Sequence, residues 1–351
     1  MLYWFIGNLI QEAFMNIRDI AKLAGVTHTT VSKILNNKGS ISEETKKKVL
    51  AIIKKNNFYP SEAARRTSLG RGGEIAFVSS KYASPFISMV LEGVENSSYG
   101  TGKYEKMLST YSTRGSSEIK DETFMKIASG RLADAVIVLA LKPNEDAMKE
   151  FKKTGIPVIL LESRMKGADS ITVDNVSGAY DAVSYLAGSG RKHIAIIRGV
   201  TGNEEVGPVP HDREKGYKKA VTDAGLKADN NLLEEVIEYT FEEGREALDN
   251  LLARNKKTDS IFCAAGDMCA LGVMQRAQEL GIKIPQDISI IGFDDIPAAS
   301  LVKPGLATVK QPVYELGKKT FEMAIDHAEN RLLDTVNVVI KPELIIRASA
   351  G

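Results

Sequence analysis

From Glu74 to the carboxyl terminus, the chain alternates short apolar runs with longer amphipathic stretches. The apolar runs are rich in β-branched residues, as buried parallel strands are, and they comprise Ile75–Val78, Ala135–Ala140, Pro157–Leu161, Ile194–Ile197, Ile261–Ala265 and Ile288–Ile291. The stretches between them have helical periodicity, and they include Phe86–Tyr99, Asn175–Ala187, Glu214–Ala224, Glu242–Arg254 and Asp267–Leu280. This alternation predicts an α/β fold with open parallel sheets. Its length of roughly 280 residues favours two doubly wound lobes over one small sheet.

The segment before Glu74 begins with the pattern of a short amphipathic helix. Its apolar residues recur at i, i+3, i+4 and i+7 and form one stripe, made of Ile17, Ile20, Ala21 and Ala24. Asn16 can cap the start of this helix, and Gly25 can end it in the left-handed conformation. The corner Gly25-Val26-Thr27 leads into a second helix, with Thr27 as its cap. Together the two helices predict a helix-turn-helix within a small all-α domain.

The second helix has an apolar and a polar side. Val31, Ile34 and Leu35 are expected to be buried, and the opposite side carries hydrogen-bonding residues of which none is acidic: His28, Thr29, Ser32, Lys33 and Asn36. Such side chains can contact base edges and phosphates in the major groove of DNA. The pattern therefore predicts a DNA-binding head, and the alternative is a helical pair that serves only in packing.

The charge distribution supports a DNA-binding head independently of the motif. Residues 15–71 contain twelve Lys or Arg and four Asp or Glu, whereas residues 72–351 contain 34 basic and 40 acidic residues. The net charge of +1 therefore combines a head of +8 with a body of −6, and Glu12 supplies the remaining −1. A local positive charge of this size is typical of proteins that contact phosphates.

A third helix is expected after Ser42, with Val49, Ile52 and Ile53 on its inner side. Five lysines lie on its outer side, at positions 46, 47, 48, 54 and 55. A lysine-rich helix face is often simply solvated. These lysines are therefore weaker indicators of DNA contact than the second helix.

The sequence Gly25-Val26-Thr27-His28-Thr29-Thr30-Val31-Ser32-Lys33-Ile34-Leu35-Asn36-Asn37 resembles the LacI/GalR family of bacterial repressors. The resemblance implies that the second helix lies in the major groove with its first residues on base edges. His28 and Thr29 are then the main base readers, and Lys33 lies one turn further on. Thr30, Ser32 and Asn36 are expected to bind phosphates, and Thr27 starts the same DNA-contacting helix.

Residues 60–73 are expected to form a hinge helix and linker after a helix-turn-helix domain of residues 15–59. In the family, such a hinge orders on DNA, pairs with its dimer mate and inserts a leucine into the minor groove. Carried onto this chain, the resemblance places Ala64, Arg65 and Thr67 at the DNA. Thr67 occupies the leucine position, and Leu69 lies about 200° further around a helix. We therefore expect a weaker or differently placed DNA kink, which equal bend angles for wild type and Thr67→Leu would contradict.

The family landmarks of the body appear in order, and they are Ser84-Pro85-Phe86, Val173-Asp174-Asn175, Asp212-Arg213-Glu214-Lys215-Gly216-Tyr217, Ala270-Leu271-Gly272, Gly292-Phe293-Asp294-Asp295 and Thr308-Val309-Lys310-Gln311-Pro312. The resemblance implies a body of residues 74–351 like the periplasmic sugar-binding proteins, with two lobes, three crossovers and a ligand in the cleft. The crossovers are expected near Asn175, near Thr308–Gln311 and before Val336. The first lobe would hold about residues 74–174 and 312–334, and the second about 175–307 and 335–351.

Open parallel sheets bind ligands outside the carboxyl ends of their strands, and several landmarks are expected there. Arg213 and Asp294 are the strongest candidates for an effector site, because a guanidinium fork and a carboxylate can each bridge neighbouring hydroxyls. Phe86 and Phe293 could cover an apolar ring face. Asp174, expected to end the strand before the first crossover, completes this edge of the sheets.

Asp267 has two interpretations. It either contacts the effector or caps the helix that follows it. The family often places asparagine just before this residue, and here Gly266 removes that amide and opens space. The neighbouring carboxylate of Asp295 is expected to point away from Asp294 and to serve in a loop or cap.

Catalytic and metal-binding patterns are weak. A phosphate loop at Gly100-Thr101-Gly102-Lys103 would need glycine at position 97 and Ser or Thr at position 104, where Ser97 and Tyr104 stand. Cys263 and Cys269 lack ligand spacing, and His193, His211 and His327 are scattered. The sequence therefore predicts neither an enzyme nor a cofactor, and both cysteines are expected in the core of a cytoplasmic protein.

Residues 1–14, MLYWFIGNLIQEAF, are too short to span a bilayer and lack the basic start and cleavage site of a signal peptide. Since members of the resembled family begin close to the first helix, Met15 is expected to be the true start. The whole pattern predicts a repressor that binds double-stranded operator DNA as a homodimer under the control of a sugar-like effector. A solute-binding protein for transport is the alternative, which the basic head and the missing export signal oppose.

Overall fold

The structure is a computed structural model that describes residues 15–35, 39–56, 58, 73–99, 107–201, 207–255, 257–329 and 335–351. The chain divides into two compact units after Gly72. Across those ranges, no helix combines the length and the apolar character needed to cross a membrane.

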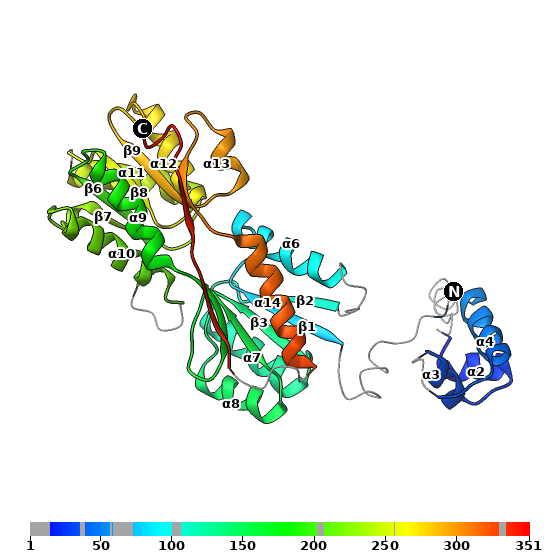
Figure 1. The fold of residues 1–351 in the computed structure, drawn as a ribbon. Helices are drawn as coiled ribbons and strands as arrows, with labels where there is room; N and C mark the ends of the chain where they lie inside the picture. The colour runs from blue at the N-terminus through cyan, green and yellow to red at the C-terminus, as the bar shows by residue number, and fades with distance from the viewer. Residues whose placement is uncertain are drawn as a thin grey trace, which may run out of the picture. The chain divides into compact units, whose positions relative to one another are not determined.

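The first unit contains helices α2 (Ile17–Ala24), α3 (His28–Leu35) and α4 (Glu43–Lys55) (Figure 1). Asn16 caps α2 through a capping box with Asp19, and Gly25 ends the helix at a φ of 70°. The Thr27 hydroxyl accepts the N–H of Thr30 at 3.1 Å and so caps α3. These local signals confirm the predicted boundaries of the helix-turn-helix.

Packing in this unit also follows the predicted apolar stripes. Ile20, Val31 and Val49 bring one fully buried side chain from each of the three helices into a common core. Phe58, which lies after α4, joins the same core with 8% of its surface exposed. The helices are too short to be stable alone in water, so this core holds their arrangement.

The body contains two six-stranded sheets. The first has the order β11-β5-β4-β3-β1-β2 with all pairs parallel. Its strands are β1 (Glu74–Ser79), β2 (Met107–Ser112), β3 (Ala135–Leu139), β4 (Val158–Leu161), β5 (Asp169–Val173) and β11 (Asn337–Ile340). Helices α6 (Pro85–Tyr99) and α14 (Val313–Ala328) cover one face, and α7 (Ser117–Gly130) and α8 (Glu145–Thr154) cover the other.

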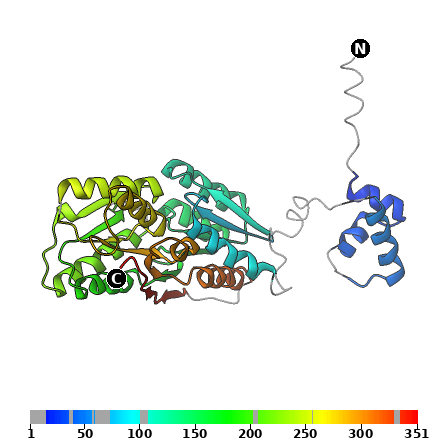
Figure 2. The same cartoon turned by 90° about the horizontal axis from the view of Figure 1, so that it is seen from above.

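The second sheet has the order β12-β10-β9-β8-β6-β7, in which only the β10–β12 pair is antiparallel. Its strands are β6 (Ile194–Gly199), β7 (Leu233–Val236), β8 (Ser260–Cys263), β9 (Ser289–Asp294), β10 (Ala307–Lys310) and β12 (Glu343–Ile345). Helices α11 (Phe241–Arg254), α12 (Asp267–Glu279) and α13 (Pro297–Leu301) pack on one face, and α9 (Asn175–Gly188) and α10 (Val209–Asp223) pack on the other. The predicted α/β class with two doubly wound lobes is confirmed, and Figure 2 shows the lobes side by side.

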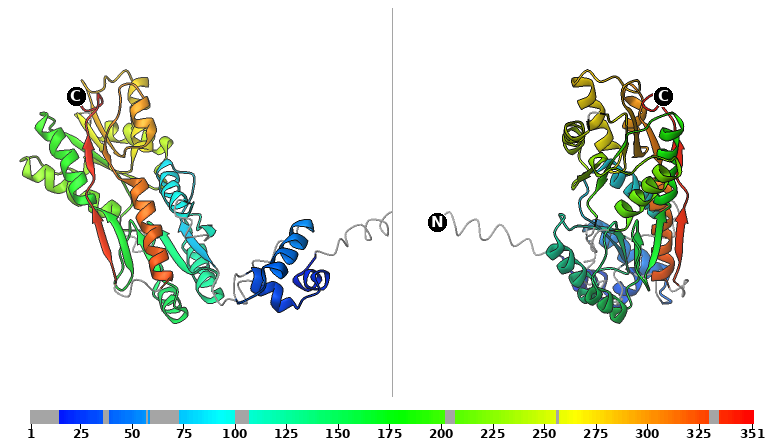
Figure 3. Two further views of the ribbon diagram at one scale, coloured as in Figure 1. Left: turned by 45° about the vertical axis from the view of Figure 1, so that its right-hand side comes forward. Right: turned by 90° about the vertical axis from the view of Figure 1, so that its left-hand side faces the viewer.

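Three segments connect the lobes. The first lies between β5 and α9, and the second lies between β10 and α14. The third was expected before Val336, and this is wrong. Asn337–Ile340 forms β11 of the first sheet, where it pairs with Ser170–Val173 of β5. The chain crosses only at Lys341 and Pro342 before β12, and the red segment of Figure 3 follows this path along both lobes.

Helix α10 begins earlier than its sequence suggested. Glu214–Ala224 was expected to be helical with Arg213 at its start, but the helix runs from Val209, with Pro208 as its N-cap residue and Pro210 in its first turn. Proline is compatible with a first turn because the N–H it lacks has no intrahelical acceptor there. Arg213 therefore lies one turn inside the helix, where it is held more rigidly than a residue at the start.

Candidate functional site

The exposed side of α3 is the first candidate site. His28, Thr29 and Lys33 are exposed on it, while Ser32 is partly buried. The hydroxyls of Thr27 and Thr30 lie 2.9 Å apart and hydrogen-bond to each other, which fixes the first turn of the helix. The exposed side thus presents an imidazole, a hydroxyl and an ammonium group on a rigid scaffold.

The other residues that the sequence predicted to contact DNA lie outside the described ranges. They are Asn36, Ala64, Arg65 and Thr67. Residues 1–14 also lie outside those ranges.

The second candidate site is a cavity of about 330 Å³ between the two lobes. It is formed by the segment after β1, the segment after β7, the turn from β8 to α12 and the end of β9. All four follow carboxyl ends of parallel strands, as expected for a ligand site in this fold. The lining residues are Ala83, Ser84, Pro85, Phe86, Glu238, Tyr239, Thr240, Phe241, Glu242, Ala265, Gly266, Met268, Asp294 and Ile296.

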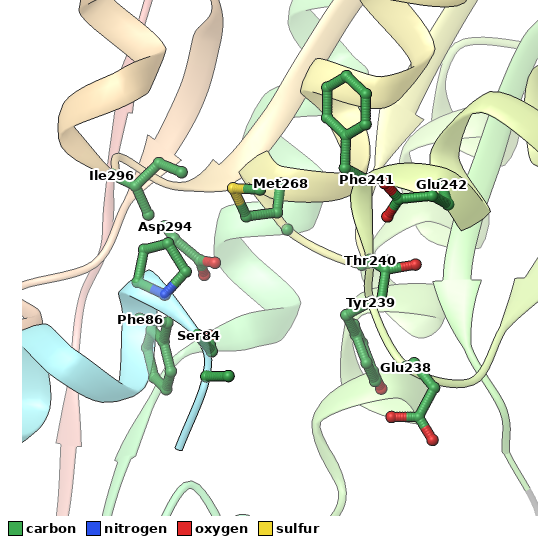
Figure 4. Close-up of a pocket in the computed structure, with 14 residues that line it drawn as sticks. Ser84, Phe86, Glu238, Tyr239, Thr240, Phe241, Glu242, Met268, Asp294 and Ile296 are labelled. Carbon is green, nitrogen blue, oxygen red and sulfur yellow. The ribbon is translucent and has the colours of Figure 1, made fainter. Parts of the chain in front are cut away.

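Asp294 is the predicted effector residue that lies most directly at this cavity. It ends β9 with a φ of 119°, and its Oδ1 accepts a hydrogen bond from Gln311 Nε2 at 2.6 Å. Burial raises the pKa of Asp294 to about 6, although the charge of Arg213 and the bond from Gln311 both lower it. Figure 4 shows Asp294 and Phe86 on one side of the cavity and Tyr239 and Thr240 on the other.

Arg213 is not among the residues that line the cavity. Its Nε donates to Asn175 Oδ1 and its Nη1 donates to the carbonyl oxygen of Ala264, both at 2.7 Å. The guanidinium carbon lies 3.6 Å from the centre of the Phe293 ring. Two of its donor atoms therefore hydrogen-bond protein acceptors, and its positive charge lowers the pKa of Asp294.

A buried carboxylate links this arginine to the first lobe. Glu162 follows β4, and its two oxygens accept the N–H of Val173 at 2.6 Å and Nδ2 of Asn175 at 2.9 Å. Burial raises the pKa of Glu162, while the bonds from Asn175 and Val173 and the charge of Arg213 lower it. A continuous hydrogen-bonded path thus runs from Glu162 in the first lobe through Asn175 to Arg213 in the second.

Of the other predicted effector residues, Phe86 lines the cavity, whereas Phe293 and Asp174 are not among its lining residues. Phe293 is fully buried in the core, where its ring packs against Arg213. Asp174 is the N-cap residue of α9 and accepts the N–H of Ser177 at 3.0 Å.

The interpretation of Asp267 as a helix cap is wrong, and Asp267 is not among the residues that line the cavity. The N-cap residue of α12 is Gly266, and Asp267 is fully buried with Oδ2 accepting the N–H of Ile296 at 2.9 Å. Its Oδ1 accepts the hydroxyl of Thr308 at 2.7 Å. Asp267 therefore connects α12 to β10 and to the segment after β9 through hydrogen bonds.

Asp295 accepts a hydrogen bond from Nη2 of Arg347 at 2.7 Å and so anchors the end of the chain.

Sequence reasoning missed the segment 238–242, which supplies a whole side of the cavity. Strand β7 is short and carries two glutamates, so its sequence lacks the apolar signature of a buried strand. Thr240 and Glu243 form a capping box at the start of α11, which could have identified the residues before it as a loop. Tyr239 has a φ of 60°, and a Cβ on Gly199 would lie only 1.8 Å from its hydroxyl oxygen.

Direct contacts between the lobes flank the cavity. Lys81 pairs with Glu238, and Arg164 pairs with Asp212. The N–H of Gly207 also donates to the carbonyl oxygen of Ala140 at 3.4 Å. The lobes are thus joined by polar contacts as well as by the three connecting segments.

Comparison with known proteins identifies the family of the chain. Residues 16–61 match the family of bacterial regulatory proteins, lacI family, and residues 183–350 match the periplasmic binding protein-like domain. The transcriptional regulator RegA of Clostridium saccharobutylicum is 31% identical over 95% of this chain and 98% of its own length. Catabolite control protein A of Priestia megaterium is 30% identical over 95% of this chain and 99% of its own.

Solved structures share the fold. The lac repressor dimer bound to operator and the anti-inducer ONPF superposes with a TM-score of 0.82 and 21% identity, covering 96% of this chain and 99% of that one. A transcriptional regulator CelR–cellobiose complex gives a TM-score of 0.70 and 24% identity over 95% of this chain and 99% of that one. The two relatives, which match over nearly their whole length at 31% and 30% identity, confirm the family expected from the sequence. The chain belongs to the LacI family of bacterial transcription regulators.

Proposed function

We propose that this protein is a repressor that binds operator DNA as a homodimer and changes its operator affinity when a sugar-like effector occupies the cavity between the lobes. The observation that carries the proposal is the pairing of an exposed, polar α3 with a cavity at the carboxyl ends of the strands. A ligand-controlled regulator requires a DNA-binding site and a small-molecule site on the same chain.

The exposed side of α3 supports sequence-specific binding. A recognition helix places its first residues on base edges, and here His28 and Thr29 are both exposed in the first turn. Lys33 lies one turn further along the same helix. The surplus of basic residues between positions 15 and 71 supplies the phosphate attraction that makes DNA binding salt-dependent.

The cavity supports a small polar effector. Its volume of about 330 Å³ is at the lower end of the range for ligand sites. Ser84, Tyr239 and Thr240 offer hydroxyls, and Asp294 offers a carboxylate oxygen. Two structural neighbours are complexes with sugars, CelR with cellobiose and a LacI family regulator from Enterococcus faecium with ribose.

The dimer follows from the geometry of DNA. A helix-turn-helix reads one half-site, and two-fold operators are read by two copies whose spacing matches one helical turn. Binding of operator DNA also places the protein in the cytoplasm, where the bacterial chromosome is accessible.

Operator binding can be tested with DNA selected from a random library by the full-length protein. We expect His28→Ala to weaken binding of the selected sequence by about 1–3 kcal/mol and to relax base preference at one position. Lys227→Ala is a matched control, because this exposed lysine lies in the second lobe. Failure to enrich any sequence, or an unchanged preference in His28→Ala, would contradict the proposed role of α3.

A further inference from the structure

The cavity between the lobes is acidic. Three carboxylates line it, those of Glu238, Glu242 and Asp294, and its lining residues include no lysine, arginine or histidine. Glu238 is paired with Lys81 from the first lobe. Arg213 is not among the lining residues, and its Nε and Nη1 are bonded to protein acceptors. The charged side chains of the lining itself are therefore all carboxylates.

Asp294 is open toward the cavity through one of its oxygens. Oδ1 is bonded to Gln311, whereas Oδ2 accepts no hydrogen bond from any residue in the described ranges. A Cβ on Gly266 would lie 2.9 Å from this Oδ2, so any larger residue there would crowd it. With a φ of 106°, Gly266 also adopts a backbone conformation that suits glycine. The turn from β8 to α12 thus keeps Oδ2 uncovered.

Aromatic rings surround the same space. Phe86 comes from the first lobe, and Tyr239 and Phe241 come from the segment after β7. Figure 4 shows Phe86 beside Asp294 and Tyr239 across from them. Aromatic faces attract cations, and carboxylates hydrogen-bond them. An acidic cavity lined by aromatic residues favours a cationic group over an anionic one.

We infer that the effector carries a protonated amino group that binds Asp294 Oδ2, which makes an amino sugar its chemical class. This inference rests on the proposed function, because it names the ligand of the same cavity. A phosphorylated sugar would place its charge against Glu238, Glu242 and Asp294. A neutral sugar could donate to Asp294 through a hydroxyl, but it would gain no charge attraction from the three carboxylates.

Calorimetric titration of the full-length protein with matched sugars tests the inference. The probes are glucose, glucosamine and glucose 6-phosphate, together with the corresponding galactose and mannose series. In at least one series we expect the amino sugar to bind at least about tenfold more tightly than the neutral sugar, with the phosphate weakest. Equal or tighter binding of the neutral or phosphorylated member in every series would overturn the inference, as would the absence of binding by every amino sugar at millimolar concentration.

Substitutions of the lining carboxylates test which residue causes the preference for the amino sugar. Asp294→Asn keeps an acceptor for Gln311 and removes the charge, so the preference for the amino sugar should fall to within about threefold. Glu242→Gln changes an exposed residue of the lining, and it should lower amino-sugar affinity by a smaller factor without affecting the fold. Asp295→Asn is the matched control, because its carboxylate faces Arg347. A preference that survives in Asp294→Asn would overturn the assignment of this residue.

The two proposals fail in different ways. If a neutral or phosphorylated sugar binds and changes operator affinity, the regulatory function stands and the inferred ligand class is wrong. If an amino sugar binds through Asp294 but leaves operator affinity unchanged, the ligand class stands and the regulatory function is wrong.

Discussion

Asp267 illustrates how a residue near a ligand site can be structural. Its carboxylate is fully buried and accepts bonds from Ile296 and Thr308, which belong to different segments of the second lobe. Sequence alone could not separate this role from ligand contact, because both partners are distant along the chain. Asp294 ends strand β9, and its Oδ1 accepts a hydrogen bond from Gln311. Asp294 lines the cavity, whereas Asp267 does not.

Replacing Asp267 by alanine should destabilise the body without changing the cavity lining. The substitution leaves the Ile296 N–H and the Thr308 hydroxyl buried without an acceptor, which costs about 1–3 kcal/mol for each group. Denaturant unfolding followed by circular dichroism measures the effect. Asp146→Ala, at an aspartate that is 82% exposed, should change stability by less than about 0.5 kcal/mol. Equal stability of the two variants would contradict the role given to Asp267.

The raised pKa of Asp294 predicts how stability depends on pH. The groups that act on this carboxyl are Arg213, Gln311, Glu162 and Asp267. Arg213 and Gln311 lower its pKa, but burial raises the pKa by more. Because the pKa is about 6 in the folded state and near 3.8 in the unfolded state, the folded state holds the proton between these values. The contribution of Asp294 to the free energy of unfolding should therefore fall as pH rises from about 4 to about 6 and then level off.

Asp294→Asn removes this titration. The difference in unfolding free energy between wild type and variant should change by something of the order of 2 kcal/mol across that interval and stay constant above it. Urea titrations at a series of pH values measure this difference. A difference that is constant from pH 4 to pH 6 would show that Asp294 titrates normally.

At the scale of elements, close helix packing shapes the second lobe. A Cβ on Gly272 of α12 would lie 1.9 Å from the carbonyl oxygen of Phe241, the first residue of α11. Phe241 also lines the cavity. The distance between α11 and α12 therefore sets the position of the segment that sequence reasoning missed.

Gly272→Ala should separate α11 from α12 and destabilise the lobe by about 1–3 kcal/mol, as overpacked cores do. It should also weaken effector binding, because Phe241 moves with α11. Gly188→Ala is the matched control, since nothing lies within 4 Å of a Cβ at that helical glycine. Thermal unfolding and ligand titration of both variants make the comparison, and a fully stable Gly272→Ala would contradict the close contact.

The elements that could be predicted are those whose signals are local. Capping residues and apolar stripes specify α2 and α3, and β-branched runs specify the central strands. Strand β7 could not be predicted because its glutamates mask its position at the edge of a sheet. The start of α10 was hidden by Pro208 and Pro210, and the place of β11 depends on pairing with β5, which is distant in sequence.

At the scale of the whole body, the ion pairs between the lobes hold the cleft together weakly. Lys81 and Glu238 are 50% and 45% exposed, and Arg164 is also 50% exposed. Exposed pairs of this kind contribute about 0–1 kcal/mol because water and salt screen them. The balance between open and closed lobes can therefore be shifted by a ligand that bridges them.

Removing one such pair should reduce effector affinity modestly. Arg164→Met is expected to weaken binding by up to about fivefold, because the closed arrangement loses at most about 1 kcal/mol. Lys149→Met breaks an exposed pair with Asp146 inside the first lobe and should leave affinity unchanged. Calorimetric titration of both variants measures their effector affinity. A loss of affinity in both variants, or in neither, would show that the Arg164–Asp212 pair does not bridge the closed cleft.

The central claim is that occupancy of the cavity and affinity for operator DNA are linked. Fluorescence anisotropy of a labelled operator, titrated with protein at saturating and zero effector, measures this link directly. The account predicts that the effector changes the operator Kd of wild type by about 5–150-fold and that of Asp294→Asn by much less. An operator Kd that is unchanged by a ligand known to fill the cavity would contradict it.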